Sequence, residues 1–587
     1  MNTTWLILGI GFALLATRRF RPDFVVIATA IALQLSGALS LEQTLAGFSN
    51  PAVLTMAAFM ILSYSARGIE LSRYWESFLR WRASSAGSIS FWSMWGSGLL
   101  GSIMQDELAI GTLMPGTIRA GRKHGIPPSK LLMPLAYGAL LGRTMWLVGS
   151  PAALLLVWAM SDQGMTAFGV FDFALISVIF LLFGSLYVGF LGHTVLPRKR
   201  AEADPLDRFR IRQRLREFII RVDSPMIGRS LGEMNWGKGV DPIILGIKRV
   251  NEPTFAPTAQ LQMVHGDILV AQVDPEQVKQ ISDEMGLESV PNVDLNQDDI
   301  TRGDIELVEV VVRLESSLQG QSLRQVDFRR RYGLSVLAIA RGTQVLVDHL
   351  GDTLLQGGDV LLIQGDRRRV DLMLPEVKAI PLGERAIEQT TKERSWWALG
   401  GVVVALGLAA SGWLSTLAAF LLMALVMSVL SRFPTRDAYR TLDWPLLVLL
   451  AGVIPWATAM ETSGLTKVLV DSLLSVWVEP NPYMLLMALY LLVVGLVTVM
   501  NAPIVAVLIP PVAMGIAVKL GVSAEPFLMV TALAASAVFL WPVGHRTHVL
   551  VQSTGGYIAS DYPKMGIWLI VLLGLLNLLI VPAFWPF

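Results

Sequence analysis

The stretch that decides the fold is 88–118, SISFWSMWGSGLLGSIMQDELAIGTLMPGTI, which is apolar but interrupted in its middle by Gln105-Asp106-Glu107. Basic residues flank it on both sides, at 67–82 and at 119–130. Because Lys and Arg collect on the cytoplasmic side of a membrane, both ends of the stretch are expected inside. Each arm has about 15 residues, or roughly 22 Å of helix, which is too short to cross the hydrocarbon core. The stretch is therefore predicted to be a re-entrant hairpin with its tip at 105–107.

The composition is that of a membrane protein with a soluble insert. Of the 587 residues 53% are hydrophobic and only 16% are charged, whereas a soluble protein has about 25% charged residues. Residues 201–395 hold 31 of the 46 acidic residues. A net charge of +1 offers no basic face for nucleic acid. The sequence has no Cys, which excludes disulfides and thiolate metal sites.

The remaining apolar segments are long enough for simple or broken membrane helices. The start of the chain has no basic segment and no cleavage site, so it is predicted to be a retained first helix. Basic clusters place the 205–380 insert on the cytoplasmic side of the plasma (inner) membrane. The predicted spans are 4–16, 23–40, 51–66, 131–160 and 168–195 in the first half, 1–200, and 396–411, 413–431, 444–460, 526–552 and 566–585 in the second half, 395–587.

The second half repeats the plan of the first in inverted orientation. The stretch 481–519 is predicted to be a second re-entrant hairpin, with its tip at Asn501-Ala502-Pro503. Each hairpin precedes a long apolar segment that is interrupted near its centre, at 149–151 and at 541–544. Inverted repeats with paired interruptions indicate a secondary transporter. The alternative is that these residues are ordinary packing kinks, but their corresponding positions in both halves favour the transporter.

The insert contains a direct repeat, which predicts two α+β modules at 205–295 and 303–380. SPMIGRSL at 224–231 corresponds to SSLQGQSL at 316–323, and VHGDILV at 264–270 corresponds to QGGDVLLI at 356–363. Runs of β-branched residues, such as 306–312 and 360–363, predict strands between Gly/Asp turns. The pattern resembles the TrkA-C (RCK C-terminal) domain in tandem, which implies a regulatory or dimerising appendage.

Four motifs in the membrane segments point to one family: GFSNPAVLT at 47–55, PSKLLMPLA at 128–136, FLMVTALAAS at 527–536 and GGYIASDY at 555–562. Together with the tandem modules they resemble the divalent-anion:sodium symporter family of sulfate and dicarboxylate transporters, over nearly the whole chain. The resemblance implies a homodimer with a scaffold part and a moving part that carries the hairpins and a small anionic substrate.

The sequence departs from that family where sodium would bind. The resemblance implies a Ser-Asn-Thr type sequence at each hairpin tip and each broken helix, and most of these oxygen-bearing side chains are replaced here. Sodium coupling by the family's usual geometry is therefore doubtful, and we assign no metal site and no cofactor.

Charged residues stand where those oxygens would be. Asp106, Glu107, Arg143, His545 and Arg546 lie in apolar segments, where a charge costs at least about 2.5–3.5 kcal/mol and needs a partner or a cavity. We expect either carboxylate to pair with either arginine; these pairs either serve transport or only lock the hairpins to the broken helices. The predicted substrate-binding residues are Ser150, Asn501, Arg546, Thr547 and Arg143, and the candidates for carrying coupling protons are Asp106, Glu107, His545 and His548.

The sequence thus predicts an α-helical polytopic membrane protein that transports a small anion, such as sulfate or a dicarboxylate, by an elevator movement. The coupling ion is sodium or a proton, and the altered sodium motifs favour the proton. The alternative is a membrane anion sensor without transport, in which the insert relays the state of a static pocket. A membrane enzyme has no support, because Ser, His and an acid never occur together at a spacing that suggests a nucleophile.

Overall fold

A computed structural model gives the structure of the chain and describes residues 2–17, 19–65, 71–196, 209, 211–231, 234, 242–249, 254–255, 257, 260–290, 305–313, 316–342, 344–382, 394–430, 442–475, 481–542 and 545–587. The basic residues at 198–200 and 432–440, which contribute to the predicted sidedness of the chain, lie outside the described residues. So do Val543 and Gly544 in the second predicted interruption, and the predicted module boundaries near 205 and 295–303.

The first half consists of helices, most of which lie within the predicted segments. The predicted span 23–40 is too long, because α2 ends at Leu35 ahead of Gly37 with its φ of 76°, and α3 and α5 lie outside the predicted spans. They are α1 (Asn2–Thr17), α2 (Pro22–Leu35), α3 (Leu41–Leu45), α4 (Pro51–Ser65), α5 (Leu71–Arg82), α6 (Ala86–Ile103), α7 (Asp106–Lys123), α8 (Leu132–Gly142), α9 (Pro151–Asp162), α10 (Asp172–Tyr187) and α11 (His193–Val195).

The second half is helical in the same way. Its helices are α17 (Arg394–Ala410), α18 (Thr416–Leu430), α20 (Trp444–Thr462), α21 (Leu465–Ser475), α22 (Pro482–Val499), α23 (Ala502–Leu508), α24 (Pro510–Leu520), α25 (Glu525–Ala535), α26 (Arg546–Gly555) and α27 (Asp561–Phe584).

Each of the four predicted interruptions separates two helices. α6 ends at Ile103 and α7 begins at Asp106, and α22 ends at Val499 before α23 begins at Ala502. The two long segments break over 143–150 and 536–545. Proline lies in the first turn of α9 and of α23, where its missing N–H costs no hydrogen bond. Proline therefore favours a new helix start at these positions.

Six of the described helices are long and apolar enough to cross a membrane, and α6 and α7 are not among them. The predicted arm length of about 15 residues is wrong, because α6 and α7 have 18 residues each, as many as α22. Composition and not length therefore separates them from α22 and the 502–520 helix, which both meet the criterion, and the length argument supports re-entry of neither pair. Re-entry of the two helix pairs and the inverted symmetry of the halves stay predictions. The six are Leu41–Ser65, Asp172–Val195, Trp444–Thr462, Pro482–Val499, Ala502–Leu520 and Asp561–Phe584.

The insert folds into two antiparallel five-stranded sheets of the same topology. The order is β3-β2-β4-β1-β5 in the first and β8-β7-β9-β6-β10 in the second, and an irregular pairing recurs at β2/β4 and β7/β9. The elements are β1 (Leu215–Ile220), β2 (Ile243–Lys248), β3 (Thr254–Phe255), β4 (Ile268–Gln272), α13 (Val278–Met285), β5 (Leu287–Val290), β6 (Ile305–Val312), α15 (Phe328–Tyr332), β7 (Ser335–Arg341), β8 (Gln344–Leu346), β9 (Val360–Asp366), α16 (Arg367–Glu376) and β10 (Ala379–Pro381).

The repeated aspartate of the two modules has the same role in both. Asp267 and Asp359 are buried and pair with Arg249 and Arg341, each at 2.7 Å. Although burial acts to raise the pKa of Asp267, hydrogen bonds from Arg249 and from the Val264 N–H lower it below its usual range. The sequence repeat therefore corresponds to a structural one: in each module an arginine at the end of a strand pairs with an aspartate in a turn.

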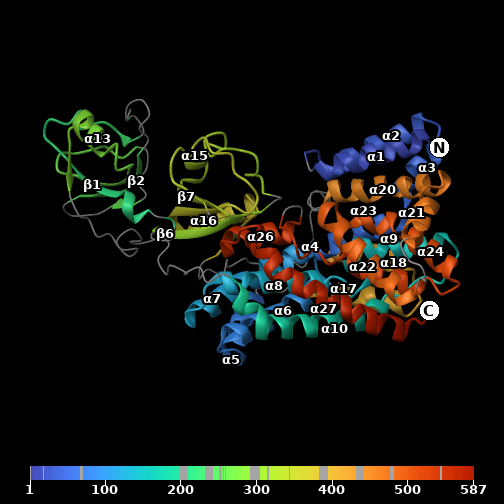
Figure 1. Ribbon diagram of the computed structural model, residues 1–587. Coiled ribbons are helices and arrows are strands. Elements are labelled where there is room, and N and C mark those ends of the chain that lie inside the picture. The colour runs from blue at the N-terminus through green and yellow to red at the C-terminus, as the bar shows by residue number, and fades with distance from the viewer. Residues whose placement is uncertain are drawn as a thin grey trace.

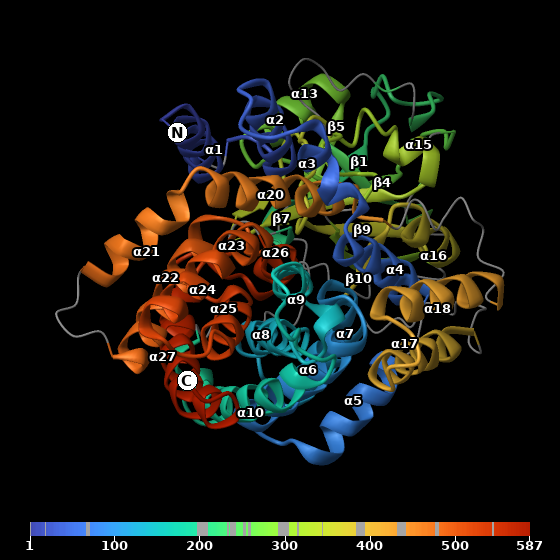
Figure 2. The ribbon, with the colours of Figure 1, turned by 90° about the vertical axis from the view of Figure 1, so that its right-hand side faces the viewer.

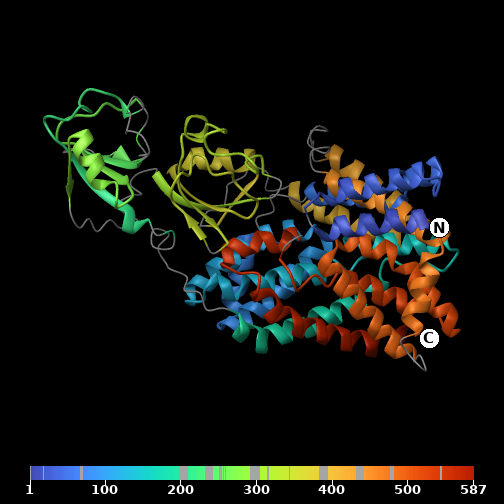
Figure 3. The ribbon, with the colours of Figure 1, turned by 45° about the horizontal axis from the view of Figure 1, so that its top comes forward.

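The sheets lie at one end of the helical bundle, and both chain termini lie at the other end (Figures 1 and 3). Helices α1, α2 and α20 run along one edge of the bundle, and α10 and α27 run along the opposite edge (Figure 2). The second sheet contacts α26 directly: the Gly342 N–H donates to Ser553 Oγ at 3.1 Å. A side chain at Gly358 would approach the Val549 carbonyl to 2.7 Å, so this contact requires glycine.

Candidate functional site

One cavity of about 570 Å³ collects all four interruptions. Its walls include residues from both predicted hairpin tips and from both broken segments: Gln105, Asp106, Glu107, Arg143, Ser150, Asn501, Ala502, Pro503, His545 and Arg546. Its size suits a small ligand. Breaks that are far apart in the sequence thus meet around a single space.

Six of the described helices begin at this cavity: α2 and α20, and the four that follow the interruptions, α7, α9, α23 and α26. The start of a helix carries unpaired N–H groups and a partial positive charge, which together favour an anion. At α7 the first turn carries Asp106 and Glu107, which already supply the negative charge that this start favours. The first turns of α9, α23 and α26 contain no acidic residue, so their N-termini leave a positive potential in the cavity.

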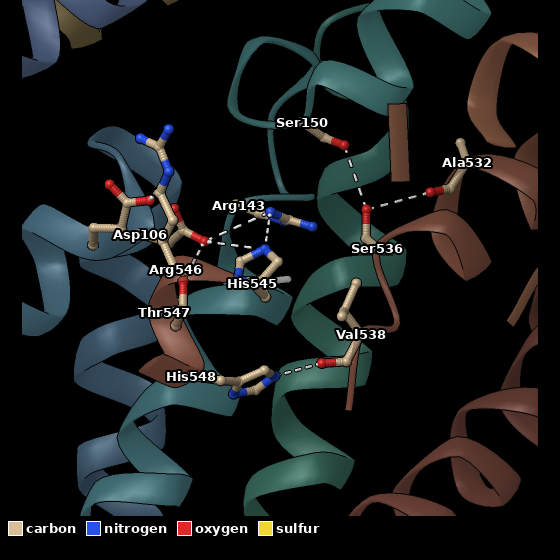
Figure 4. A network of polar contacts seen from close by, with 11 residues as sticks. Asp106, Arg143, Ser150, Ala532, Ser536, Val538, His545, Arg546, Thr547 and His548 are labelled. Atoms are coloured by element: carbon tan, nitrogen blue, oxygen red, sulfur yellow. Dashed lines mark hydrogen bonds and ion pairs between the residues drawn. The ribbon is translucent and has the colours of Figure 1, made fainter. Parts of the chain in front are cut away.

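Asp106 is the centre of a polar cluster that joins three segments (Figure 4). Its Oδ2 lies 3.6 Å from Arg143 Nη1 and 3.9 Å from His545 Nε2, and it accepts a hydrogen bond from the Thr547 hydroxyl at 2.9 Å. These contacts tie the first turn of α7 to the break after α8 and to the start of α26. The expected carboxylate–arginine pairing is therefore realised by Asp106 and Arg143.

His545 is held by Arg143 rather than by a carboxylate. Arg143 Nη1 lies 3.0 Å from His545 Nε2, and because a guanidinium only donates, Nε2 is the acceptor. The imidazole is then neutral with its proton on Nδ1, a buried atom that has no hydrogen-bond partner among the described residues. In this arrangement His545 has the capacity to take up a proton only after Arg143 moves.

Arg546 makes the shortest ion pair of the site, and sequence reasoning missed its partner. Arg546 Nη2 lies 2.5 Å from Asp443 Oδ2, whereas Arg546 Nε lies 3.9 Å from Glu107 Oε1. Asp443 also caps α20, where its Oδ1 accepts the Leu446 N–H at 3.3 Å. The only sequence signal was that of a helix cap, an Asp before Trp444-Pro445.

The other predicted site residues fall into two groups. Ser150 and Asn501 line the cavity, at the starts of α9 and α23. The Ser150 hydroxyl caps α9 by accepting the Ala153 N–H at 3.3 Å, and it lies 3.4 Å from the Ser536 hydroxyl. Thr547 and His548 are fully buried and are not among the lining residues. His548 Nε2 donates to the Val538 carbonyl at 2.6 Å, within the second break. These two side chains position the broken segment.

The cavity is nearly neutral in formal charge. Three cations line it against four carboxylates, which gives −1 with His545 neutral: Arg21, Arg143 and Arg546 against Asp23, Asp106, Glu107 and Asp443. Arg21, which is exposed at the rim, pairs at 2.9 Å with Asp23, which is buried. In the described part of the chain no group of three or more His, Asp or Glu residues is arranged to hold a metal ion.

Comparison with known proteins identifies the family. The family described as CitMHS, citrate transporter, matches residues 12–534. The chain belongs to this family. It is therefore a multi-pass secondary transporter and not an enzyme, and the resemblance drawn from the sequence motifs to anion transporters is confirmed.

Relatives agree with this assignment. The chain is 27% identical to the uncharacterized transporter YfbS of Escherichia coli, over 99% of this chain and 98% of that protein. It is 25% identical to sodium/sulfate cotransporter 2 of Chlamydomonas reinhardtii, over 60% of this chain and 42% of that protein. A segment of 59 residues is 37% identical to Ktr system potassium uptake protein C of Bacillus subtilis, which covers 10% of this chain and 26% of that protein and fits the TrkA-C resemblance.

Proposed function

We propose that this transporter carries a small oxyanion or carboxylate, of the sulfate or dicarboxylate class, through the cavity at the four interruptions. The single observation that carries the proposal is the convergence of the starts of α9, α23 and α26 with the Arg143 and Arg546 guanidinium groups on one space. Helix starts and guanidinium forks are both suited to sulfate and carboxylate oxygens. The substrate would be held by Arg546, Arg143, Ser150 and Asn501. Family and relatives support the same class of substrate.

Coupling to a cation follows from the charge of the cavity. A site whose formal charge is −1 gains negative charge when an anion enters, and in a medium of low dielectric constant this is costly unless a positive charge enters with it. We favour the proton, because titratable Asp106, Glu107 and His545 line the site, whereas most oxygen-bearing side chains expected for sodium are replaced. Sodium remains the alternative coupling ion, as in the names of the sodium/sulfate cotransporter relatives.

The proposed mechanism is an elevator movement in a homodimer of the plasma membrane, with the insert in the cytoplasm. In this mechanism α6–α9, α22–α26 and the bound anion move against the α1, α2 and α20 edge. Arg21 lines the cavity and its side chain is 60% exposed, and it lies next to basic residues expected on the cytoplasmic side. The arrangement described here then corresponds to an inward-open state. Family membership favours transport over the static sensor.

The test is uptake of a panel of labelled anions into proteoliposomes that contain the full chain, with sodium and proton gradients imposed separately. We expect uptake of sulfate or a dicarboxylate that is driven by an inward proton gradient. Uptake that needs sodium and ignores the pH gradient would contradict proton coupling. High-affinity binding without flux of any anion would contradict the transport function and favour the sensor.

A further inference from the structure

The ion pair between Asp443 and Arg546 joins two different parts of the helical bundle. Asp443 precedes α20, which packs against α2, against the 3-10 turn at Ala46–Ser49 and, on the side of the moving group, against α23. Arg546 begins α26, which packs against α8 and α7. The 2.5 Å contact between Nη2 and Oδ2 is therefore a bond between the α2/α20 edge and the helices that carry the charged cluster.

Asp443 has the chemistry of the ligand that the cavity is built to hold. It presents a carboxylate to a guanidinium, which is the strong charge-assisted contact that a free carboxylate or sulfate would make. Both residues line the cavity, and the side chains are 14% and 35% exposed for Asp443 and Arg546, so an anion entering from solvent reaches the same guanidinium. Glu107, at 3.9 Å from Nε, is the more distant of the two carboxylates.

We propose that Asp443 is a tethered competitor of the transported anion for Arg546, so that substrate binding breaks the contact between α20 and α26. The inference rests on the proposed function, because it assumes that Arg546 binds the anion. Without substrate, the pair adds to the packing of α20 on α23 in holding the two groups of helices together, and it lowers the apparent affinity for the anion. With substrate, Arg546 exchanges the Asp443 carboxylate for the bound anion, and the Asp443–Arg546 contact between α20 and α26 is broken.

The competing explanation is that Asp443 only caps α20. Substitutions that keep the cap but remove the charge distinguish this explanation from the proposal. Asn and Ser are also good helix caps, but neither carries a charge. Asp443→Asn and Asp443→Ser thus remove the ion pair and keep the cap, whereas Asp443→Ala removes both. Melting temperatures of the purified variants show whether each cap is retained.

The experiment is calorimetric titration of the full-length protein in nanodiscs with sulfate and, separately, with succinate. We expect Asp443→Asn and Asp443→Ser to lower the Kd of the bound anion by about tenfold, because a competing state is removed. An unchanged or higher Kd in both variants, with wild-type melting temperatures, would overturn the inference. If one of them does not fold, the other decides.

A further variant separates the charge of Asp443 from its packing. Glutamate at this position keeps the charge, so Asp443→Glu is expected to keep a Kd within about threefold of the wild type. A tenfold lower Kd in Asp443→Glu as well would mean that packing, not charge, sets the affinity, and would overturn the inference. If the wild type binds neither anion while its melting temperature is normal, the proposed function itself fails.

Discussion

The four helix starts that follow the interruptions form two chemically different pairs. α7 and α26 begin with ionised side chains, Asp106-Glu107 and Arg546, whereas α9 and α23 begin with the neutral sequences Ser150-Pro151 and Asn501-Ala502-Pro503. Each pair takes one member from each half of the chain. Each half of the chain thus contributes one helix start with ionised side chains and one with neutral side chains.

This division assigns different tasks to the two pairs. The charged starts contact one another, through Thr547 and Asp106 and through Arg546 and Glu107, so much of their charge is neutralised within the protein. The neutral starts keep a positive potential that no side chain of their own cancels. We infer that the neutral pair binds the anion together with Arg546 of the charged pair, and that the other contacts of the charged pair set stability, coupling and release.

Asp106→Asn should have the largest effect. It keeps an acceptor for Thr547 but removes the charge that compensates Arg143, and breaking a buried pair costs about 3–5 kcal/mol. Because both side chains are slightly exposed, at 14% and 12%, we expect the lower end of that range as a loss of unfolding free energy, measured by denaturant titration in detergent. The control is Asp23→Asn, whose partner Arg21 is 60% exposed and which should cost less than about 1 kcal/mol. Equal effects of the two variants would contradict the role of Asp106.

Arg546→Gln should lower kcat/KM for the transported anion by about 100-fold, because charge-assisted hydrogen bonds contribute about 1.5–3 kcal/mol each. Uptake into proteoliposomes measures it. Arg21→Gln, at the rim of the same cavity, is the matched loss of charge and should change kcat/KM by less than about threefold. If Arg546→Gln retains both rate and affinity, Arg546 does not bind the anion.

Asn501→Asp tests the neutral pair directly, since it gives α23 an acidic start like that of α7 without changing the size of the side chain. We expect the KM for the anion to rise by about tenfold, since the added carboxylate competes for the helix N-terminus and repels the substrate. Asn501→Ala, which adds no charge, should raise KM by only a few fold. An equal rise in both variants would mean that the amide, not the potential, matters.

Ser150→Ala should have the smallest effect, a loss of about 1 kcal/mol of unfolding free energy from the missing cap of α9. Ser150→Thr keeps a capping hydroxyl and should restore most of that stability. Thermal melts of the two variants at equal protein concentration provide the comparison. If the melting temperature of Ser150→Ala equals that of the wild type, the Ser150 hydroxyl does not stabilise the start of α9.

The sequence located the helices and their interruptions well because apolar length, Pro and Gly act locally. The break predicted at 149–151 is the end of a longer one, over 143–150. Gly149 is required there because a side chain would approach the Arg143 carbonyl to 2.3 Å. The close approach of Gly149 to the Arg143 carbonyl therefore belongs to a break that begins earlier in the chain than the Gly149-Ser150-Pro151 sequence that predicted it.

The sequence was less informative about which side chains face the cavity. Thr547 was expected at the substrate, but successive helix residues point about 100° apart, so Arg546 faces the cavity while the Thr547 hydroxyl reaches Asp106. Asp443 was missed because its partner is remote in the chain and its local pattern is that of a cap. Contacts of this kind depend on tertiary packing, which a single sequence does not encode locally.

The most direct test of one shared anion site uses the absence of Cys in the chain. Single cysteines are introduced as Gln105→Cys and Ala502→Cys, in opposite halves, and their labelling by a charged maleimide is measured as the concentration of the transported anion is raised. We predict that the anion protects both positions, with the same half-effect concentration. Protection of one position only, or of neither, would contradict a single cavity formed by both halves.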